Sequence, residues 1–372
     1  MMQGTADFNH AEQQQPKATA DQADHPHPWI LTPALDYLFC CGGLMWLLAG
    51  VEALGVKPEG QSYPSIILAG ILFWGTLLIG EAHGPATLVR VFRSRTTPKL
   101  VRAVVIVWGL VLIVAAFFAM QNLAFAQVLT KITMVWVIQH YVAQTFGIIL
   151  IYCMKRHFSL SKLERGLLQW QLRLLMFFVI LRMFTVPAFG YMPKFIGLEV
   201  PFWGPLPFWP MYLALVGFVF CTIGLVAALV WRYCRTKQIF PMPAVLTIVS
   251  VAALTMSQRD AFFLLGLTFY HSSQYLAVTY SYFVRERAKE AGHELKGSLA
   301  KEFFKAHSLG YIFALALVGF LLTTGLPQGL IKNGVSEPLC LTAIWACLNM
   351  HHYLADALIW RIRDQGVREL LV

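Results

Sequence analysis

The chain contains about ten apolar stretches of roughly 20 residues each, and this feature restricts its fold more than any other. A helix needs about 20 apolar residues to cross the roughly 30 Å hydrocarbon core of a bilayer. Hydrophobic residues make up 58% of the sequence and charged residues only 13%, about half the charged share of a soluble globular domain. The sequence therefore predicts an integral membrane protein.

We expect an all-α fold, a polytopic bundle of about ten transmembrane helices with both termini in the cytoplasm. Residues 1–30 are polar and predict a disordered tail, and residues 31–372 predict a single transmembrane helical domain. The predicted spans are Ala34–Gly55, Ser65–Val91, Leu100–Met120, Lys131–Met154, Gly166–Ala188, Trp209–Trp231, Pro241–Met256, Asp260–Val284, Leu309–Leu326 and Pro338–Trp360.

The orientation follows from the loops. Every even-numbered predicted span ends at basic residues, such as Arg90 and Arg93 after the second and Arg361 and Arg363 after the tenth. Lys and Arg accumulate on the cytoplasmic side of membrane proteins, so this alternation predicts an even number of spans with both termini in the cytoplasm. The net charge of +10 is then a topological signal, and we expect no nucleic-acid partner.

Polar residues inside the predicted spans are the candidates for a functional site, because ionisable groups in hydrocarbon are costly and usually face the bundle interior. They lie in GEAHG of the second span, WVIQHYVAQ of the fourth, FYHSSQY of the eighth and NMHHYLAD of the tenth. The candidate metal ligands are His83, His140, His271, His351 and His352. The candidate catalytic or orienting residues are Glu81, Gln144, Gln274, Tyr275 and Asp356.

All of these histidines fall on even-numbered spans, which run in one direction. Along the helix axis, each histidine lies roughly 10–22 Å from the basic residues at the end of its span. Helix tilt can narrow the differences between these distances, so the rings can meet at one depth in the membrane. Helix bundles hold transition metals with imidazoles from separate helices, and a carboxylate or amide orients the rings. For any one histidine taken alone, a packing role is the alternative.

Local spacing adds three expectations. His352 and Asp356, like His140 and Gln144, are four residues apart and share a helix face. Adjacent residues point about 100° apart, so only one of His351 and His352 need be a ligand. Glu81 reaches the site if GEAHG is locally unwound.

Four islands in this order resemble the Brp/Blh-type family of bacterial membrane β-carotene dioxygenases, which cleave carotene to retinal. The islands are GEAHGPATL, IQHYVAQTF, YHSSQY and MHHYLADALIWR, together about forty residues. The resemblance implies iron bound by His83, His140, His271 and His351. In the third island, Tyr275 stands where the family has a second histidine, with Gln274 beside it.

The leading hypothesis is therefore a membrane-embedded non-haem iron oxygenase. Its substrate would be a carotenoid, another isoprenoid or an acyl lipid that enters laterally from the membrane lipids, and an external electron donor would be a partner if the reaction consumes electrons. A haem-binding electron-transfer protein with histidine axial ligands is one alternative. A proton-coupled transporter, in which the same side chains relay protons, is another.

Overall fold

A computed structural model describes residues 27–56, 62–257, 266–293, 295, 299–360 and 364–371. Nearly all of the regular structure in these ranges is helical, and a two-stranded antiparallel hairpin, β1 (Met192–Phe195) and β2 (Leu198–Val200), is the one sheet described. Only residues 27–30 of the predicted tail belong to the described part, so its predicted disorder stays a prediction.

The helices before the hairpin are α1 (Pro33–Leu35), η1 (Asp36–Cys40), α2 (Gly43–Ala53), α3 (Tyr63–Gly75), η2 (Thr76–Gly80), α4 (His83–Arg93), α5 (Lys99–Ala119), α6 (Leu123–Lys155), α7 (Lys162–Thr185) and α8 (Pro187–Gly190). Those after it are α9 (Phe208–Thr236), α10 (Met242–Met256), η3 (Leu267–Ser272), α12 (Ser273–Glu290), α13 (Ala300–Phe303), α14 (Ala306–Phe320), η4 (Leu321–Gly325), α15 (Leu326–Lys332), α16 (Glu337–Ile359) and α17 (Gln365–Leu371). The elements labelled η are π-helical.

Each predicted span contains helix, but fewer than ten helices meet the requirements for crossing a membrane. Six helical segments of the described chain are long and apolar enough, and the bent pair Pro33–Cys40 and Gly43–Ala53 makes a seventh if it is one span. The helix α10 has only 15 residues, and the predicted span Asp260–Val284 begins outside the described residues. The fold is that of a multi-pass helical membrane protein, and a total of ten spans is not shown.

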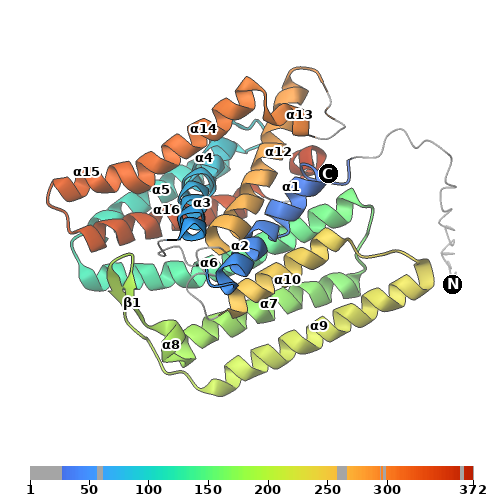
Figure 1. The fold of residues 1–372 in the computed structure, drawn as a ribbon, viewed down its shortest axis with the longest axis horizontal. Helices are drawn as coiled ribbons and strands as arrows, with labels where there is room; N and C mark the ends of the chain where they lie inside the picture. The colour runs from blue at the N-terminus through green and yellow to red at the C-terminus, as the bar shows by residue number, and fades with distance from the viewer. Residues whose placement is uncertain are drawn as a thin grey trace, which may run out of the picture.

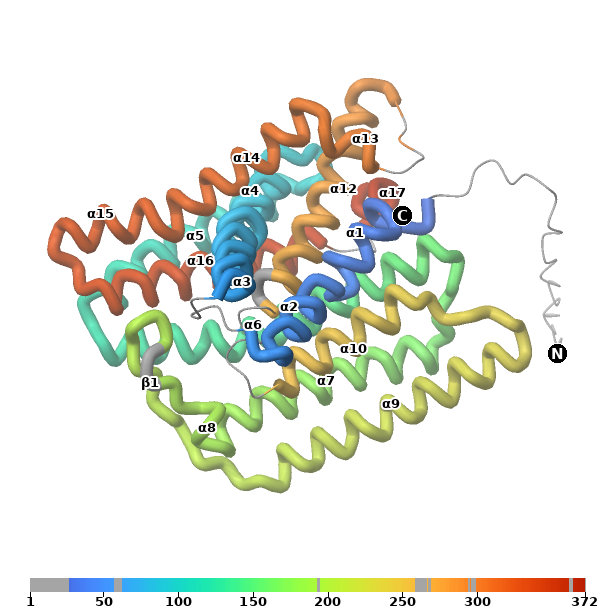
Figure 2. The backbone as a smooth tube through the Cα atoms, viewed as in Figure 1, coloured from blue at the N-terminus to red at the C-terminus, as the bar shows by residue number. Residues whose placement is uncertain are grey.

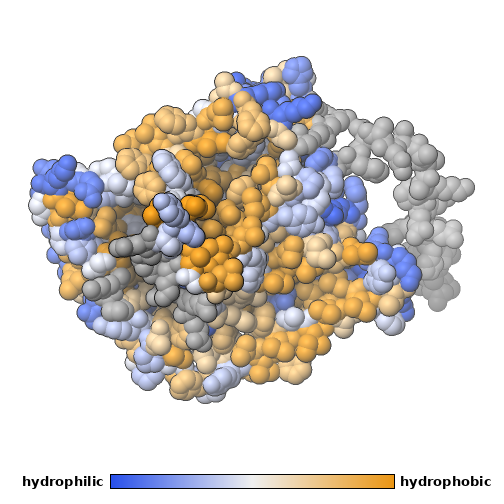
Figure 3. Space-filling view, viewed as in Figure 1, coloured by the Kyte–Doolittle hydropathy of each residue, from blue (hydrophilic) through white to orange (hydrophobic). Residues whose placement is uncertain are grey.

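Most of the long helices run roughly along the long axis of the molecule (Figure 1). The connection from α9 to α10 lies at one end of this axis, while the hairpin and the α15–α16 connection lie toward the other. Hydrophobic side chains cover the middle of the visible face, and hydrophilic ones gather toward the two ends (Figure 3). This distribution fits a molecule that crosses a bilayer along its long axis.

The helix α6 forms the inside of the bundle, whereas α5 and α9 lie outside. In their most apolar stretches, 56% of the residues of α6 are buried, against 11% for α5 and for α9. Since α5 and α9 expose mainly large apolar side chains, they are suited to face lipid. The helix α16 packs against α5 and α6, and α17 packs against α12 (Figure 2).

Two π-helical segments lie directly beside predicted site residues. The segment η2 ends at Gly80, and after the turn at Glu81 and Ala82 the helix restarts as α4 at His83. His271 lies within η3. A π turn shifts the direction of the following side chains and occurs frequently at functional sites. Glu81 and Ala82 keep right-handed helical dihedral angles, and Tyr63–Arg93 forms one long apolar helical segment, so GEAHG contains a π-helical irregularity but is not unwound as expected.

Candidate metal centre

Four histidines from four helical segments meet in the interior of the bundle. They are His83 at the start of α4, His140 in α6, His271 in η3 and His352 in α16. The ring centroids of His83 and His352, His140 and His271, and His140 and His352 are 4.7, 4.8 and 4.8 Å apart, and the other recorded pairs reach 6.1 Å. The predicted common depth is thus realised in three dimensions.

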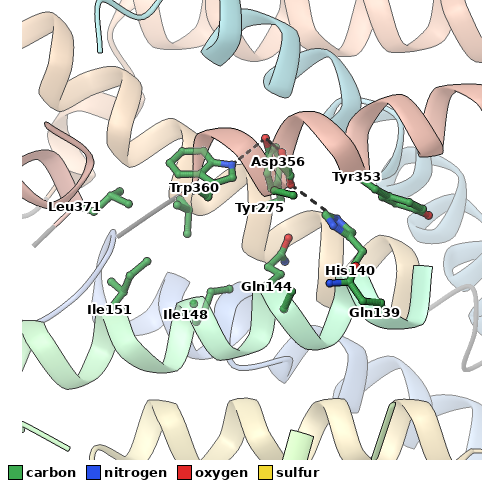
Figure 4. Close-up of a pocket in the computed structure, with 14 residues that line it drawn as sticks. Gln139, His140, Gln144, Ile148, Ile151, Tyr275, Tyr353, Asp356, Trp360 and Leu371 are labelled. Atoms are coloured by element: carbon green, nitrogen blue, oxygen red, sulfur yellow. Dashed lines mark hydrogen bonds and ion pairs between the residues drawn. The ribbon is translucent and has the colours of Figure 1, made fainter. Parts of the chain in front are cut away.

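The Nε2 atoms of His140 and His352 are 3.1 Å apart. The carboxylate of Asp356 lies beside both, with Oδ2 3.8 Å from His140 Nε2 and 3.6 Å from His352 Nε2. Figure 4 shows the side chain of His140 on α6 directed toward Asp356 on α16. All three side chains are largely buried.

A second group of ligand atoms comes from His83, His271 and His352. Its atoms, like those of His140, His352 and Asp356, all lie within 4.8 Å of one another. His352 belongs to both groups and therefore lies at the centre of the cluster. Imidazole nitrogens and a carboxylate are donors that suit iron, copper, nickel or zinc, so the residues present fit a transition-metal ion.

His271 provides the most direct indication of a missing partner. Its side chain is 1% exposed, and neither ring nitrogen has a hydrogen-bond partner. Buried polar groups in folded proteins are nearly always hydrogen-bonded, because an unpaired one costs about 1–3 kcal/mol. The ring packs against Tyr141, with centroids 4.4 Å apart, which holds it toward the cluster. A metal ion would satisfy one of these nitrogens.

Two of the other histidine rings, His83 and His352, are oriented by hydrogen bonds through Nδ1. His83 Nδ1 contacts the carbonyl oxygen of Gly80 and the hydroxyl of Ser272. The hydroxyl of Thr87 lies 2.6 Å from His352 Nδ1 and 3.2 Å from Asp356 Oδ1. Such partners fix the tautomer and direction of a metal-binding imidazole.

Tyr275 joins the same network from α12. Its hydroxyl donates to Asp356 Oδ1 at 2.7 Å, lies 2.7 Å from the Thr87 hydroxyl and accepts from the Trp360 indole at 3.2 Å. Tyr275 therefore orients the carboxylate of Asp356. Tyr275 does not belong to either group of possible ligands.

The structure separates the other predicted residues from the cluster. His351 points toward α5, where Nε2 lies 3.3 Å from the carbonyl oxygen of Val105. Gln144 donates to the His271 carbonyl at 2.9 Å and to Gln274 Oε1 at 3.1 Å, so these amides hold the backbone of η3. Glu81 lies beside the cluster without joining either ligand group.

Two cavities lie on different sides of the cluster. The first, of about 310 Å³, reaches from His140, Tyr275 and Asp356 to Trp360 and Leu371, and Figure 4 shows these side chains around it. The second, of about 290 Å³, is lined by residues of η2, α4, α14, η4 and α16, among them His83 and His352. The cluster therefore lies between two mainly apolar cavities.

Sequence reasoning missed Thr87 and the stacking of Tyr353 on His140, whose ring centroids are 4.5 Å apart. One signal for Thr87 was present, because it lies four residues after His83 and shares its helix face. Tyr353 gave no such signal, because an aromatic residue next to a histidine in a span is ordinary packing. No protein-family model, curated protein or solved structure matches this chain.

Proposed function

We propose that this protein is a metal-dependent oxygenase of the bacterial inner membrane, with iron as its metal and a lipophilic molecule as its substrate. The proposal includes ten membrane spans with both termini in the cytoplasm. The resemblance of the four histidine islands to the Brp/Blh-type family favours iron over other metals and a carotenoid, another isoprenoid or an acyl lipid as substrate.

The observation that carries the proposal is the convergence of four imidazoles on one buried point, where His271 has two unpartnered ring nitrogens. His352 shows the arrangement that favours a ligand set: its Nδ1 is bonded to the Thr87 hydroxyl, while its Nε2 faces the Nε2 atom of His140 and the carboxylate of Asp356.

A bound iron would supply oxygen activation, and the protein residues would supply geometry. His83, His140, His271 and His352 would hold the ion, with Asp356 as a further oxygen donor. Thr87 and Tyr275 would keep the Asp356 carboxylate and the His352 ring in place. The buried surroundings would exclude water from the centre, which protects reactive species from side reactions.

Metal analysis of the purified protein tests the proposal. We expect about one iron or a small integral number per chain in the wild type, and loss of most of it in His271→Ala and His140→Ala. The matched control is His351→Ala, which removes an imidazole from the adjacent position of the same helix and should leave the metal in place. A folded wild-type protein without bound metal would refute the proposal.

The optical spectrum of the same sample distinguishes the alternatives. A Soret band would identify haem and would replace the oxygenase by an electron-transfer protein. A sample without metal or haem that moves protons or solutes across liposome membranes would identify a transporter. Oxygen consumption that depends on an added carotenoid or other lipid would support the enzyme.

A further inference from the structure

A buried lysine at the end of α6 has no role in the proposed metal centre. The side chain of Lys155 is 2% exposed. Among the described residues, none forms a hydrogen bond or an ion pair with its ammonium group, and its electrostatic neighbours are Asp36 and Arg285. A buried charge is costly unless it is paired, so this ammonium group needs a partner of opposite charge.

The carboxylate of Asp36 is bonded to other donors. It accepts hydrogen bonds from the backbone N–H groups of Ile30 and Leu31 at 2.7 and 2.9 Å, and from the Tyr152 hydroxyl at 3.0 Å. These bonds hold the segment before α1 against α6. Asp36 therefore reduces the positive charge around Lys155 without bonding to its ammonium group.

Arg285 on α12 adds a second positive charge at this place. Its guanidinium group donates to the carbonyl oxygen of Leu295 at 2.7 Å and to the hydroxyl of Ser281 at 3.4 Å, and both acceptors are uncharged. The next residue, Glu286, accepts a hydrogen bond from Ser94 instead. Two cations and one carboxylate leave a net positive charge here, which an anionic group would balance.

The two cations continue the helix faces that line the first cavity. This cavity runs along α6 from His140 to Ile151 (Figure 4). Lys155 follows Ile151 by four residues and so shares its helix face. Val278 lines the cavity from α12, and Arg285 lies two helical turns after it. Because helical side chains lean toward the N-terminus of their helix, both cations lean back toward the cavity.

The dimensions of the cavity suit a single apolar chain. At 1.5 Å rise per residue, the stretch of α6 from His140 to Ile151 is about 16 Å long. Three successive bonds of an extended chain span about 3.8 Å, so this length corresponds to roughly 13 bonds. At about 30 Å³ for each water-sized group, the volume of about 310 Å³ holds roughly ten groups. Both values indicate a chain of about 10–13 carbons.

We propose that the first cavity binds a single apolar chain with an anionic head group, a carboxylate or a phosphate, which lies between Lys155 and Arg285 while the chain extends toward the histidine cluster. The inference rests on the proposed function only where it makes this ligand the substrate, because binding itself does not require a metal. In that case the substrate is an acyl lipid and not a carotenoid, since a carotenoid carries no charge to pair with these cations.

Quenching of tryptophan fluorescence by brominated probes tests this proposal. The full chain in lipid nanodiscs would be titrated at mildly alkaline pH with 11-bromoundecanoate, 11-bromoundecyl phosphate or the uncharged 11-bromo-1-undecanol, at matched mole fractions in the bilayer. Trp360 lines the first cavity and Trp345 the second. We expect at least one anion to bind about 10-fold more tightly than the alcohol, with quenching that Trp360→Phe removes and Trp345→Phe retains.

Substitutions of the two cations assign the preference to them. Lys155→Met should abolish most of the difference between anion and alcohol, Arg285→Met should reduce it, and Lys155→Arg, which keeps the charge, should retain part of it. The matched control is Arg287→Met, which removes an exposed cation two residues further along α12. This variant should keep the full difference, because the preference does not come from general attraction to a basic surface.

Three outcomes would overturn the proposal: equal binding of the anions and the alcohol by the wild type, quenching that depends on Trp345, or a full preference in Lys155→Met. The wild-type comparison needs no variant and stands even if Lys155→Met does not fold. The two anionic probes distinguish a free fatty acid from a phosphorylated lipid as the ligand.

Metal content is measured separately, so the two proposals can fail independently. A metal-free protein that prefers the anion would refute the enzyme and retain this site. An iron-containing protein without that preference would retain the enzyme and refute this site.

Discussion

Thr87 is the residue that links two proposed ligands on α16 to α4. Its hydroxyl contacts His352 Nδ1, Asp356 Oδ1 and the Tyr275 hydroxyl. We predict that Thr87→Val lowers metal affinity by about 10–100-fold, the usual effect of removing a side chain that orients a ligand. Metal titration of the stripped protein measures this.

The control for this prediction is Thr342→Val, also a buried threonine. The Thr342 Oγ1 has no hydrogen-bond partner, so replacing the hydroxyl by a methyl group should leave stability unchanged or slightly higher. Metal affinity should not change, because Thr342 is in neither ligand group. Equal metal affinity in the wild type and Thr87→Val would show that the Thr87 contacts do not orient the site.

At the scale of elements, the close packing of α14 against the turn before α4 positions His83. Gly319→Ala would press a methyl group against the Glu81 backbone. We predict a decrease of about 1–3 kcal/mol in the free energy of unfolding, as for other overpacked sites, together with weaker metal retention because His83 follows the displaced turn. Thermal melting with metal analysis measures both effects.

Gly310 on the same helix is the matched control. An added Cβ atom at this position has no neighbour within 4 Å, and alanine favours helix over glycine by about 0.5–1 kcal/mol. Gly310→Ala should therefore raise the melting temperature slightly. If Gly319→Ala also raised the melting temperature, α14 would not be in tight contact with the turn at Glu81.

At the scale of the whole molecule, the proposed topology is testable with a native cysteine. Of the seven cysteines, Cys234 is the exposed one, five are buried and Cys221 is intermediate. Cys234 lies near the basic end of α9, which the positive-inside rule assigns to the cytoplasm. We predict that a membrane-impermeant maleimide labels it in inside-out vesicles and not in right-side-out ones.

Asn333→Cys provides the opposite reporter. Asn333 is exposed in the connection between α15 and α16, at the other end of the molecule (Figure 1). In a Cys234→Ser background it should be labelled only in right-side-out vesicles. Labelling of both positions from the same side would contradict the proposed orientation.

The positions of the helices were largely predictable because span length and apolar composition are local properties of the sequence. All ten predicted stretches contain helix. The number of membrane spans was not predictable in the same way, since α10 is short and α16 carries His351, His352 and Asp356 within its apolar sequence. Whether such helices cross a membrane or lie inside the bundle depends on their neighbours.

His83, His140, His271, His352 and Asp356 were all among the predicted residues, because ionisable groups in apolar spans are rare and costly. The same signal also selected Glu81, Gln144, Gln274 and His351, which the structure leaves outside both ligand groups. The choice between His351 and His352 was left open by the sequence, and the resemblance favoured His351 for its spacing to Asp356. The structure instead brings His352 into the cluster and directs His351 to Val105. Adjacent helical residues point about 100° apart, so the sequence cannot tell which of the two faces the site until the rotation of the helix about its axis is known.

By itself, the sequence determined a helical membrane protein with a few polar groups inside its apolar segments, because hydrophobic length acts on each segment separately. Only the tertiary structure decided which imidazoles meet, that Thr87 joins His352 to Asp356, and that Glu81 borders a separate cavity. These features depend on the tilt, rotation and π-helical breaks of helices far apart in the chain. Side-chain packing between those helices sets their tilt, their rotation and the positions of the π-helical breaks.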